Sequence, residues 1–223
     1  MPPADPAPSS TPLTLHLVRH GRTVYNSEGR LQGWCDSPLT EEGLRGVRVT
    51  AEHLSGTSFA AAYASPSGRT VATARELLRH HPGTGLTTLD GLREFSFGDY
   101  EATLEVELWA RIDPHEMFTG VLMGTFEGLP GGESSPTYLA RVEAAFEQIV
   151  AAHRDDEHVL VVGHGVTLMA YLVMVHGAAV SPLANASIST VEIHADGGRR
   201  VVLAGLDPAA QGLPQPPVPA GPE

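Results

Sequence analysis

The sequence predicts an α/β fold: a three-layer α/β/α sandwich with a doubly wound, mostly parallel sheet and an inserted cap region. Short apolar runs typical of buried strands alternate with segments of helical periodicity between residues 13 and 203. The 223 residues, 42% of them hydrophobic and 18% charged, fit one globular domain. We expect that domain over residues 13–205, with the cap at about 95–132, between flexible Pro-rich tails at 1–12 and 206–223.

The first half of the chain alternates predicted strands with predicted helices. Three apolar runs indicate strands, at residues 13–19, 59–65 and 86–89. Thr40 is the expected N-cap of a helix that runs to about Ser55, because two glutamates follow it in the first turn. A turn at 66–68 leads into a second helix over 69–79. This alternation is that of a βαβ unit with parallel strands.

The second half begins with the cap, whose residues 95–132 lack clean periodicity. Ser135 is the expected N-cap of the next helix, with Pro136 in its first turn. The run VLVVG indicates a central strand that leads into a helix from about Val166. Two last strands, joined by a hairpin signal at 196–198, are expected at 189–194 and 200–203.

The charge balance and the composition exclude several classes of function. The net charge of −12 lacks the basic footprint that nucleic acid requires. All 14 basic residues are arginines, which excludes a Schiff-base lysine and a Walker-type phosphate-binding lysine. The apolar stretch 159–180 is interrupted by Gly163-His164-Gly165, so we expect a buried strand and helix there rather than a membrane span.

The single cysteine and the N-terminus bear on the compartment. Cys35 cannot form an internal disulfide or a cysteine metal cage, and we interpret it as a packing residue. Residues 1–11 have neither the basic nor the apolar region of a signal peptide. We therefore expect a cytoplasmic protein.

Four predicted strands are followed by side chains that can bind phosphate or transfer a proton. Arg19-His20 ends the first strand and Arg69 follows the second, while Glu94 follows the third and His164 follows VLVVG. Ligands of doubly wound sheets bind at the carboxyl ends of strands, near the topological switch point. One such residue alone would usually be structural or lie on the surface. Four together predict an active site.

Five segments resemble the motifs of one family, in its order and over most of residues 13–203. LVRHGRTVYNSEGRLQG looks like the signature of the histidine phosphatase superfamily, also called the phosphoglycerate mutase-like family. ASPSGRTVATA resembles its second arginine segment and LREFSFGDYEA its acidic segment. GGES is similar to its helix-opening segment and VVGHG to its second histidine segment. The acidic segment departs from the pattern at Ala102, where many relatives carry glycine.

The resemblance implies a phosphohistidine mechanism without a metal or a cofactor. His20 would attack phosphorus in line, while Arg19, Arg69 and His164 hold the equatorial oxygens. Asn26 and Gln32 match polar positions that complete the phosphate cradle as hydrogen-bond donors. The chemistry agrees, because a neutral imidazole is a competent nucleophile and clustered cations stabilise the transferring group.

Glu94 matches the family's proton donor. It would protonate the leaving oxygen and then, in our hypothesis, activate water against the phosphohistidine. The remaining histidines named here are expected to be structural, because none lies in a matching motif or in zinc-like spacing: His16, His53, His80, His81, His153, His158, His176 and His194.

Three functions compete. The chain could be a phosphomonoesterase that releases phosphate to water, a cofactor-dependent phosphoglycerate mutase, or a catalytically idle interaction protein. The last would require loss of a core residue, and the two histidines, two arginines and Glu94 are all present. We expect a phosphoric monoester hydrolase of the histidine acid phosphatase type.

The choice against a mutase depends on the charge of the cap. A mutase must enclose a bisphosphorylated acid, but the cap holds seven acidic residues against Arg111 alone: Asp99, Glu101, Glu105, Glu107, Asp113, Glu116 and Glu127. This balance favours small or less anionic phosphomonoesters, with no nucleic-acid or membrane partner.

The apolar residues of the cap leave three alternatives open. They could line the substrate mouth, form the face of a homodimer or pack in the core, and packing is the default. These residues are Val106, Leu108, Trp109, Met117, Phe118, Val121, Leu122, Met123 and Phe126.

Overall fold

The computed structural model describes residues 11–178 and 181–213, so most of both predicted tails lies outside the described residues. One sheet of six strands has the order β3-β2-β4-β1-β5-β6. The strands are β1 (Leu13–Arg19), β2 (Phe59–Ala64), β3 (Leu86–Thr88), β4 (His158–Gly163), β5 (Ile188–Ile193) and β6 (Arg199–Leu206). The first four in the sheet order pair in parallel and the last two pair antiparallel. The predicted mostly parallel α/β sheet is confirmed.

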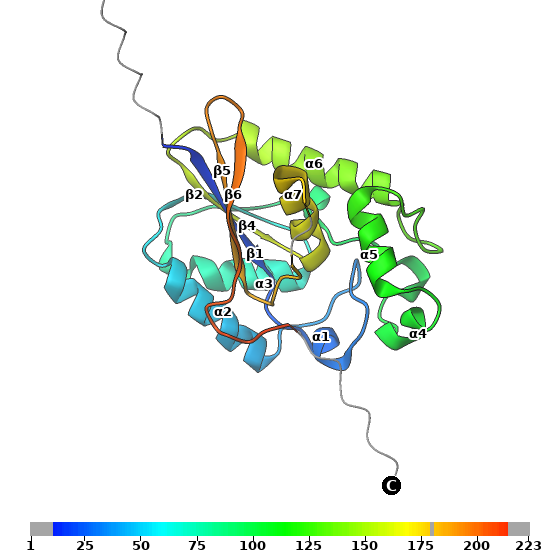
Figure 1. Cartoon of the computed structure of the whole chain (residues 1–223). Coiled ribbons are helices and arrows are strands. Elements are labelled where there is room, and N and C mark those ends of the chain that lie inside the picture. The colour runs from blue at the N-terminus through cyan, green and yellow to red at the C-terminus, as the bar shows by residue number, and fades with distance from the viewer. Residues whose placement is uncertain (1–10, 179–180, 214–223) are drawn as a thin grey trace, which may run out of the picture.

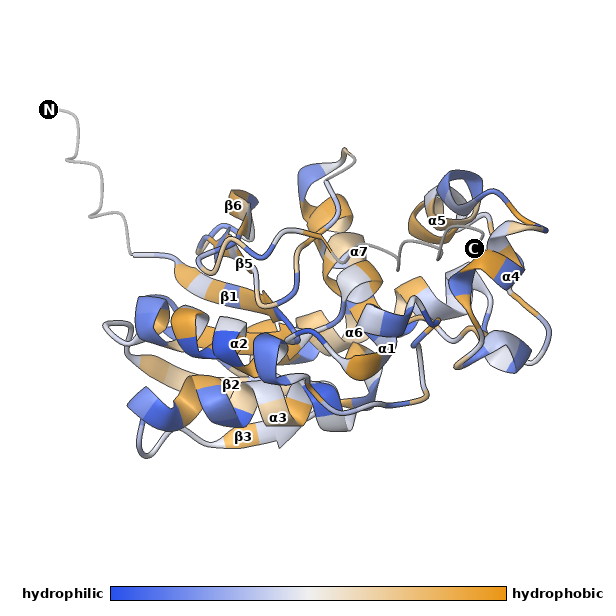
Figure 2. Ribbon diagram, turned by 90° about the horizontal axis from the view of Figure 1, so that it is seen from below, coloured by the Kyte–Doolittle hydropathy of each residue, from blue (hydrophilic) through white to orange (hydrophobic). Residues whose placement is uncertain are grey.

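Helices cover both faces of this sheet (Figure 1). Helices α2 (Glu41–Leu54) and α3 (Gly68–Leu77) cover one face, and α6 (Ser135–Ala151) and α7 (Gly165–His176) cover the other. In Figure 2 much of strand β1 is coloured hydrophobic, whereas α2 and α3 alternate hydrophilic and hydrophobic residues. Such a difference is expected, because the sheet is covered on both faces and each helix on one.

The two central strands contribute to both cores by alternation of their side chains. Leu15 and Leu17 of β1 join Val159 and Val161 of β4 in the core under α6 and α7. The intervening side chains of the same strands, Val18, Leu160 and Val162, pack in the core under α2 and α3. The near-continuous apolar runs of β1 and β4 therefore result from burial on both sides.

The element boundaries differ from the predicted ones by a few residues, as is usual at element ends. Ser134, rather than Ser135, is the N-cap of α6, because its side chain accepts from the Thr137 amide. β6 continues to Leu206, and the Gln211 side chain donates to the Glu42 carbonyl at 3.0 Å. The described part of the predicted C-terminal tail thus contacts α2.

Short elements follow the carboxyl ends of the strands. They are α1 (Val24–Glu28) after β1, and α4 (Glu105–Trp109) and α5 (Pro114–Met123) between β3 and α6. α5 contacts both α6 and α7, and α4 and α5 lie together beyond the end of the sheet (Figure 1). Three 3₁₀ turns, at 78–80, 90–92 and 98–100, complete the connections. None of the described helices is long and apolar enough to cross a bilayer.

Candidate active site

The two histidines of the motifs meet at the topological switch point of the sheet. β1 and β4 are neighbours, with Arg19 opposite Gly163, and α2 and α7 follow them on opposite faces. His20 and His164 are the first residues after these strands, and the His20 amide donates to the Gly163 carbonyl at 3.0 Å. Their ring centroids are 5.3 Å apart with an interplanar angle of 66°. This is the place at which doubly wound sheets bind ligands.

The backbone after His20 is fixed by close packing against both α2 and α3. A Cβ atom at Gly21 would lie 2.6 Å from Val47 Cγ2 and 3.0 Å from the Gly43 carbonyl oxygen, so only glycine allows this approach. The Gly21 amide donates to Thr73 Oγ1 at 3.0 Å. The His20 carbonyl accepts from Asn185 Nδ2, also at 3.0 Å. Rigid elements therefore orient the His20 ring.

Hydrogen bonds assign different tautomers to the two rings. His20 Nδ1 lies 2.8 Å from the Gly21 carbonyl, which can only accept, so Nδ1 carries the proton and Nε2 keeps a lone pair. Arg69 Nη2 lies 3.0 Å from His164 Nδ1 and can only donate, so the proton of the neutral His164 ring is on Nε2. One ring therefore presents a nucleophile and the other a hydrogen-bond donor.

Both rings are neutral at neutral pH. Burial lowers the pKa of His20 well below its ordinary value, and the charges of Arg69 and Arg19 lower it further. Burial and the charge of Arg69 have the same effect on the pKa of His164. The lone pair on His20 Nε2 is thus available without prior deprotonation.

Buried donors without a partner surround these rings. Among the described residues, His164 Nε2, Arg19 Nε and Arg69 Nε form no hydrogen bond. Burial lowers the pKa of Arg19 to about 10, against the opposing charges of Glu94 and Glu105, so this guanidinium keeps its charge at neutral pH. Because buried donors are rarely left unpaired, the three N–H groups are suited to the oxygens of an anion.

Arg69 is engaged more fully than the sequence predicted. It is 1% exposed, and its Nη atoms donate to the carbonyls of Gly33 and Cys35, to Asp36 Oδ1 and to His164. Only Nε–H remains for an anion. The structure therefore places Arg69 beside His164, which it orients, with less capacity to hold oxygens than the resemblance implied.

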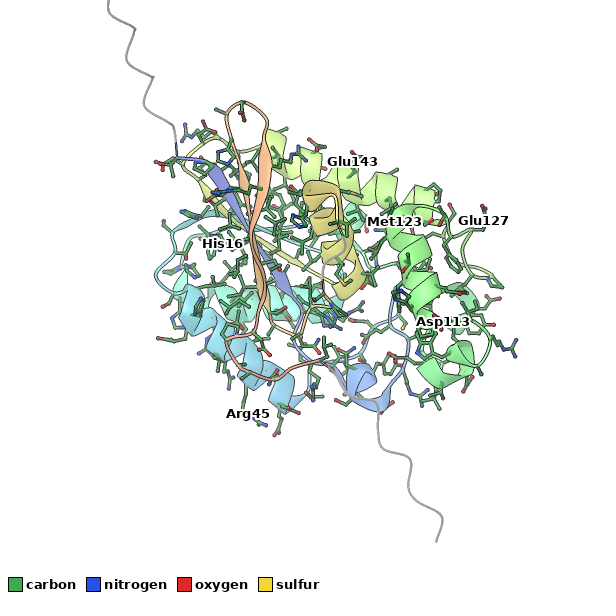
Figure 3. The ribbon with its side chains drawn as sticks, viewed as in Figure 1. His16, Arg45, Asp113, Met123, Glu127 and Glu143 are labelled. Carbon is green, nitrogen blue, oxygen red and sulfur yellow. The ribbon has the colours of Figure 1, made fainter. Side chains whose placement is uncertain are left out.

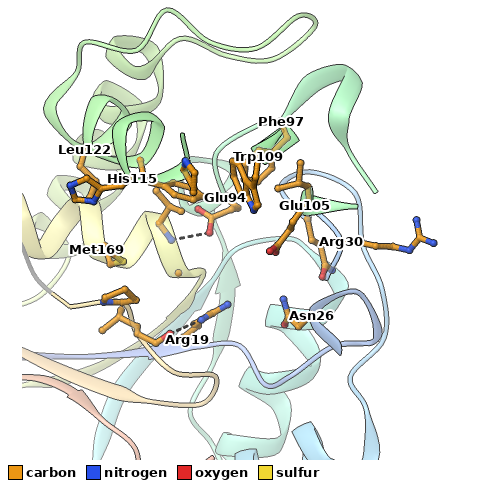
Figure 4. A pocket seen from close by; sticks show the side chains of 18 of the residues that line it. Arg19, Asn26, Arg30, Glu94, Phe97, Glu105, Trp109, His115, Leu122 and Met169 are labelled. Carbon is orange, nitrogen blue, oxygen red and sulfur yellow. Dashed lines mark hydrogen bonds between the residues drawn. The ribbon is translucent and has the colours of Figure 1, made fainter. Parts of the chain in front are cut away.

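Glu94 lies at the N-terminus of α7. Its Oε1 accepts from the Thr167 amide at 3.0 Å, the Thr167 hydroxyl at 2.9 Å and the Phe95 amide at 3.0 Å. Its Oε2 accepts from the Val166 amide at 2.9 Å and is the less occupied oxygen. Figure 4 shows this carboxyl group in the pocket wall, with the bond to the backbone amide dashed.

Two side chains that the sequence analysis did not assign hold the Glu94 segment in place. Arg141 donates to the carbonyls of Arg93 and Glu94 and pairs with Glu133. Glu133 in turn accepts from the Ser96 amide at 2.9 Å. Glu133 lies in the GGES segment, so the motif itself marked this position without indicating its contacts.

A third unassigned side chain, Glu101, ties the loop after β1 to the cap. Its carboxylate accepts from the amides of Gly33, Trp34 and Cys35 at 2.9–3.1 Å and from the Phe97 amide at 3.0 Å. This loop supplies the carbonyls that bind Arg69. Glu101 therefore acts on the site through the loop.

Asn26 and Gln32, the two predicted donors of the phosphate cradle, both lie in the wall of the pocket. A capping box at Thr23 fixes Asn26, whose Oδ1 accepts from the Thr23 amide, and its Nδ2 has no hydrogen bond among the described residues. The Gln32 amide is oriented instead by Thr23 Oγ1, to which its nitrogen donates at 2.8 Å, and by the Ser37 amide. The Nδ2 group of Asn26 is thus available to donate to a ligand, whereas the Gln32 amide is mainly engaged in hydrogen bonds within its own loop.

A cavity of about 590 Å³ extends from His20 and Arg19 to the cap. His164 and Arg69 are buried next to its floor and do not line it. Most of its wall is apolar, formed by Leu31, Phe97, Trp109, Phe118, Leu122 and Met169 (Figure 4). Glu105 and His115 of the cap are polar parts of the same wall. The arrangement can hold a tetrahedral anion at one end and an organic group at the other.

The acidic residues of the predicted cap do not all face the cavity. Of the seven acidic residues in the predicted cap, only Glu105 lines the cavity. Glu101 is bound to the loop amides, and Asp113 caps α5 by accepting from the Glu116 amide at 2.9 Å. Figure 3 shows Asp113 and Glu127 on the outer surface of the cap. Carboxylates that face solvent do not select a substrate.

The apolar residues of the cap have different positions: some pack in the core, some line the cavity and some are exposed. Leu108, Met117 and Val121 are buried in the core, as the default predicted. Trp109, Phe118 and Leu122 line the cavity. Val106 and Met123 are exposed by 64% and 66%.

Comparisons with known proteins agree with this geometry. Residues 15–205 match the family model of the histidine phosphatase superfamily (branch 1). The chain is 31% identical over 194 residues to the putative phosphoserine phosphatase 2 of Hydrogenobacter thermophilus, covering 85% of this chain and 93% of that one. It is 34% identical over 163 residues to the probable phosphoglycerate mutase GpmB of Salmonella choleraesuis, covering 70% and 71%.

Solved structures extend the likeness to the fold. The phosphoglycerate mutase from Bacillus anthracis superposes with a TM-score of 0.80 at 28% identity, covering 89% of this chain and 95% of that one. YhfR of Bacillus stearothermophilus gives a TM-score of 0.77 at 30% identity, covering 87% and 97%. The predicted resemblance is confirmed, and this chain belongs to the histidine phosphatase superfamily.

Proposed function

We propose that this protein is a phosphomonoesterase that passes the phosphoryl group through a covalent intermediate on His20. The observation that carries the proposal is the state of the His20 ring. It is neutral, its lone pair is on Nε2, and it lies at the floor of a cavity beside buried N–H groups without partners. This is the environment that an in-line attack on a phosphate monoester requires.

In the first half-reaction, His20 Nε2 attacks phosphorus and the bond between phosphorus and the ester oxygen breaks. Arg19 Nε, Arg69 Nε and His164 Nε2–H donate to the equatorial oxygens, and Asn26 Nδ2 is placed to add a further donor. Glu94 Oε2 gives its proton to the leaving oxygen, so that an alcohol departs. The charge of the transferring group is met by donors already in place.

In the second half-reaction, water replaces the alcohol. The Glu94 carboxylate accepts a proton from the water as its oxygen attacks phosphorus. The bond between His20 Nε2 and phosphorus breaks, and inorganic phosphate leaves. The cycle returns His20 to its neutral tautomer, because the proton stays on Nδ1 throughout, where it is donated to the Gly21 carbonyl.

The runner-up function is phosphoglycerate mutase, which some relatives carry in their names. A mutase must bind a second anionic group at the cap end of the cavity. The cap side chains there are apolar apart from those of Glu105, His115 and Thr119, and none of them is an arginine. A carboxylate in that wall favours the hydrolase.

The test measures both reactions on one preparation. Phosphate release from p-nitrophenyl phosphate and from phosphoglycerate is followed next to 3-to-2-phosphoglycerate exchange, with and without a bisphosphate primer. We expect phosphate release from p-nitrophenyl phosphate, slower release from phosphoglycerate, and no efficient exchange. Efficient exchange that depends on the primer would replace the hydrolase by the mutase.

A further inference from the structure

One carboxylate in the cavity wall has no partner. Glu105 is the first residue of α4, is half-buried, and its side chain forms no hydrogen bond or ion pair with any described residue. Its backbone amide donates to the Gly29 carbonyl at 2.8 Å, which fixes the start of α4 over the loop after β1. Figure 4 shows the Glu105 carboxylate directed into the pocket, on the side opposite Met169.

The cations near Glu105 are already committed. Arg30 also lines the cavity, but its Nε pairs with Glu28 at 2.7 Å and its Nη1 donates to the Ala102 carbonyl at 2.8 Å. Figure 4 shows the Arg30 guanidinium pointing away from the pocket. Arg19 is close enough that the Glu105 charge raises its pKa, but Arg19 is the cation that a bound phosphate would occupy. With phosphate bound to Arg19 and with Arg30 paired with Glu28, Glu105 is a negative charge without an ion-pair partner among the described residues.

The rest of the wall beyond the phosphate end offers little to a polar leaving group. Trp109 and Phe118 contact each other edge to face, with centroids 5.8 Å apart, and both line the cavity. Leu122 and Met169 continue this apolar surface. An aromatic or alkyl group gains about 25 cal/mol for each Å² that it buries here, whereas a polar group would lose hydrogen bonds to water.

We propose that Glu105 determines the charge specificity of the enzyme. The preferred substrate is a phosphomonoester whose leaving group has an apolar body and an ammonium group or no charge, and a second anionic group is rejected. The inference rests on the proposed hydrolase function and names its substrate class. At an effective dielectric intermediate between protein and water, a second anion roughly 6–8 Å from Glu105 is disfavoured by about tenfold, and an ammonium group is favoured by a similar factor.

The test uses three aryl phosphates of similar shape: p-methylphenyl, p-carboxyphenyl and p-(aminomethyl)phenyl phosphate. Values of kcat/KM are measured for the wild type and for Glu105→Gln, and the ratio to the p-methyl compound is formed in each enzyme. Comparing ratios between enzymes cancels the different reactivities of the phenols. We expect Glu105→Gln to raise the p-carboxy ratio by roughly tenfold and to lower the p-aminomethyl ratio by roughly tenfold.

Glu107→Gln is the matched control, because Glu107 lies on the same short helix, carries the same charge, is exposed and does not line the cavity. It should leave both ratios within about twofold. Unchanged ratios in Glu105→Gln, or equal changes in both variants, would overturn the assignment. Failure of the wild type to hydrolyse any of the three esters would instead overturn the proposed hydrolase function, so the two failures are distinguishable.

Discussion

Two pairs of histidines are positioned by β1 and β4, one pair within the strands and one pair directly after them, and only the second pair forms a candidate active site. His20 and His164 follow the carboxyl ends of β1 and β4, with ring centroids 5.3 Å apart. His158 is the first residue of β4 and His16 is the middle residue of β1, and their centroids are also 5.3 Å apart. Proximity of two imidazoles is therefore not what distinguishes the site.

The surroundings of the two pairs differ in every respect that matters for phosphoryl transfer. His16 Nε2 and His158 Nδ1 are hydrogen-bonded to each other at 3.0 Å, so one nitrogen of each ring is already engaged. Phe59 packs edge to face on His16, and no described arginine contacts either ring by a hydrogen bond. The His20 ring instead keeps Nε2 free, lines a cavity and has two buried guanidiniums beside it. The cavity and the two guanidiniums therefore distinguish the candidate site, whereas the strands only bring the two rings close together.

The largest expected effect separates the two pairs by activity. His20→Ala should lower kcat/KM for p-nitrophenyl phosphate by at least about 10⁴-fold, because it removes the nucleophile. His16→Ala removes the corresponding ring from the other pair and should leave kcat/KM within about twofold. Both variants are assayed at a temperature at which circular dichroism shows them folded. Equal rates for His20→Ala and the wild type would remove the enzymatic assignment.

A second effect concerns Glu94, a buried carboxyl group in the wall of the cavity that His20 also lines. Glu94→Gln should lower kcat on alkyl phosphates by about 10²–10⁴-fold, because an alkoxide needs a proton as it leaves. The loss on p-nitrophenyl phosphate should be smaller, since nitrophenolate leaves without one. Steady-state rates on both esters, across a pH series, provide the check. Full activity of the variant on alkyl phosphates would contradict the role given to Glu94.

A third effect appears in stability, at the histidine pair within the strands. Burial, and then the charge of His158, lowers the pKa of His16 from 6.5 to about 4. As the pH falls below 6.5, His16 of the unfolded chain binds a proton before His16 of the folded chain does. The stability contributed by neutral His16 is therefore present above pH 6.5 and is lost as the pH falls to about 4. The loss is about 3 kcal/mol in the free energy of unfolding.

His16→Gln tests this without affecting the active site. Urea denaturation at a series of pH values should show that the wild type loses about 3 kcal/mol more than His16→Gln between neutral pH and pH 4. The exposed His53 on α2 supplies the control, because His53→Gln should follow the wild-type curve. Parallel curves for His16→Gln and the wild type would show that His16 does not titrate as its burial requires.

The smallest effect tests the contacts that position Glu94. Tyr138 is fully buried, and its hydroxyl donates to Thr167 Oγ1 at 3.1 Å. Tyr138→Phe should cost about 1 kcal/mol of stability and less than about tenfold in kcat. If the hydroxyl helps to position Glu94, the loss is larger on alkyl phosphates than on p-nitrophenyl phosphate, as in Glu94→Gln. A loss that is equal on both esters would make the Tyr138 contact purely structural.

The sequence was sufficient to predict that the two histidines of the candidate site meet, because both follow strands. β1 and β4 bury both faces, so their apolar runs are unmistakable, and His20 and His164 are the next residues along the chain. Parallel pairing then brings them together, since strand ends meet at one edge of a sheet. The helices α2 and α6 were similarly predictable from capping residues and periodicity.

The cap end could not be predicted, because its short helices leave no clean period to assign inward and outward positions. From the sequence, all seven acidic residues of the cap were equally able to face the substrate, yet in the structure only Glu105 lines the cavity. The contacts of Arg69 were also hidden, since they involve backbone carbonyls of the loop after β1. Ala102 adopts φ 64°, which explains why glycine suits that position.

The most direct test of the phosphohistidine mechanism is to trap the intermediate during turnover. The reaction is quenched in base, which preserves phosphohistidine, and the protein is examined by intact mass, peptide mapping and phosphorus NMR. We expect one phosphoryl group, on Nε2 of His20, and none in His20→Ala. A phosphoryl group on His16, His164 or any other residue, or on Nδ1 of His20, would contradict the account.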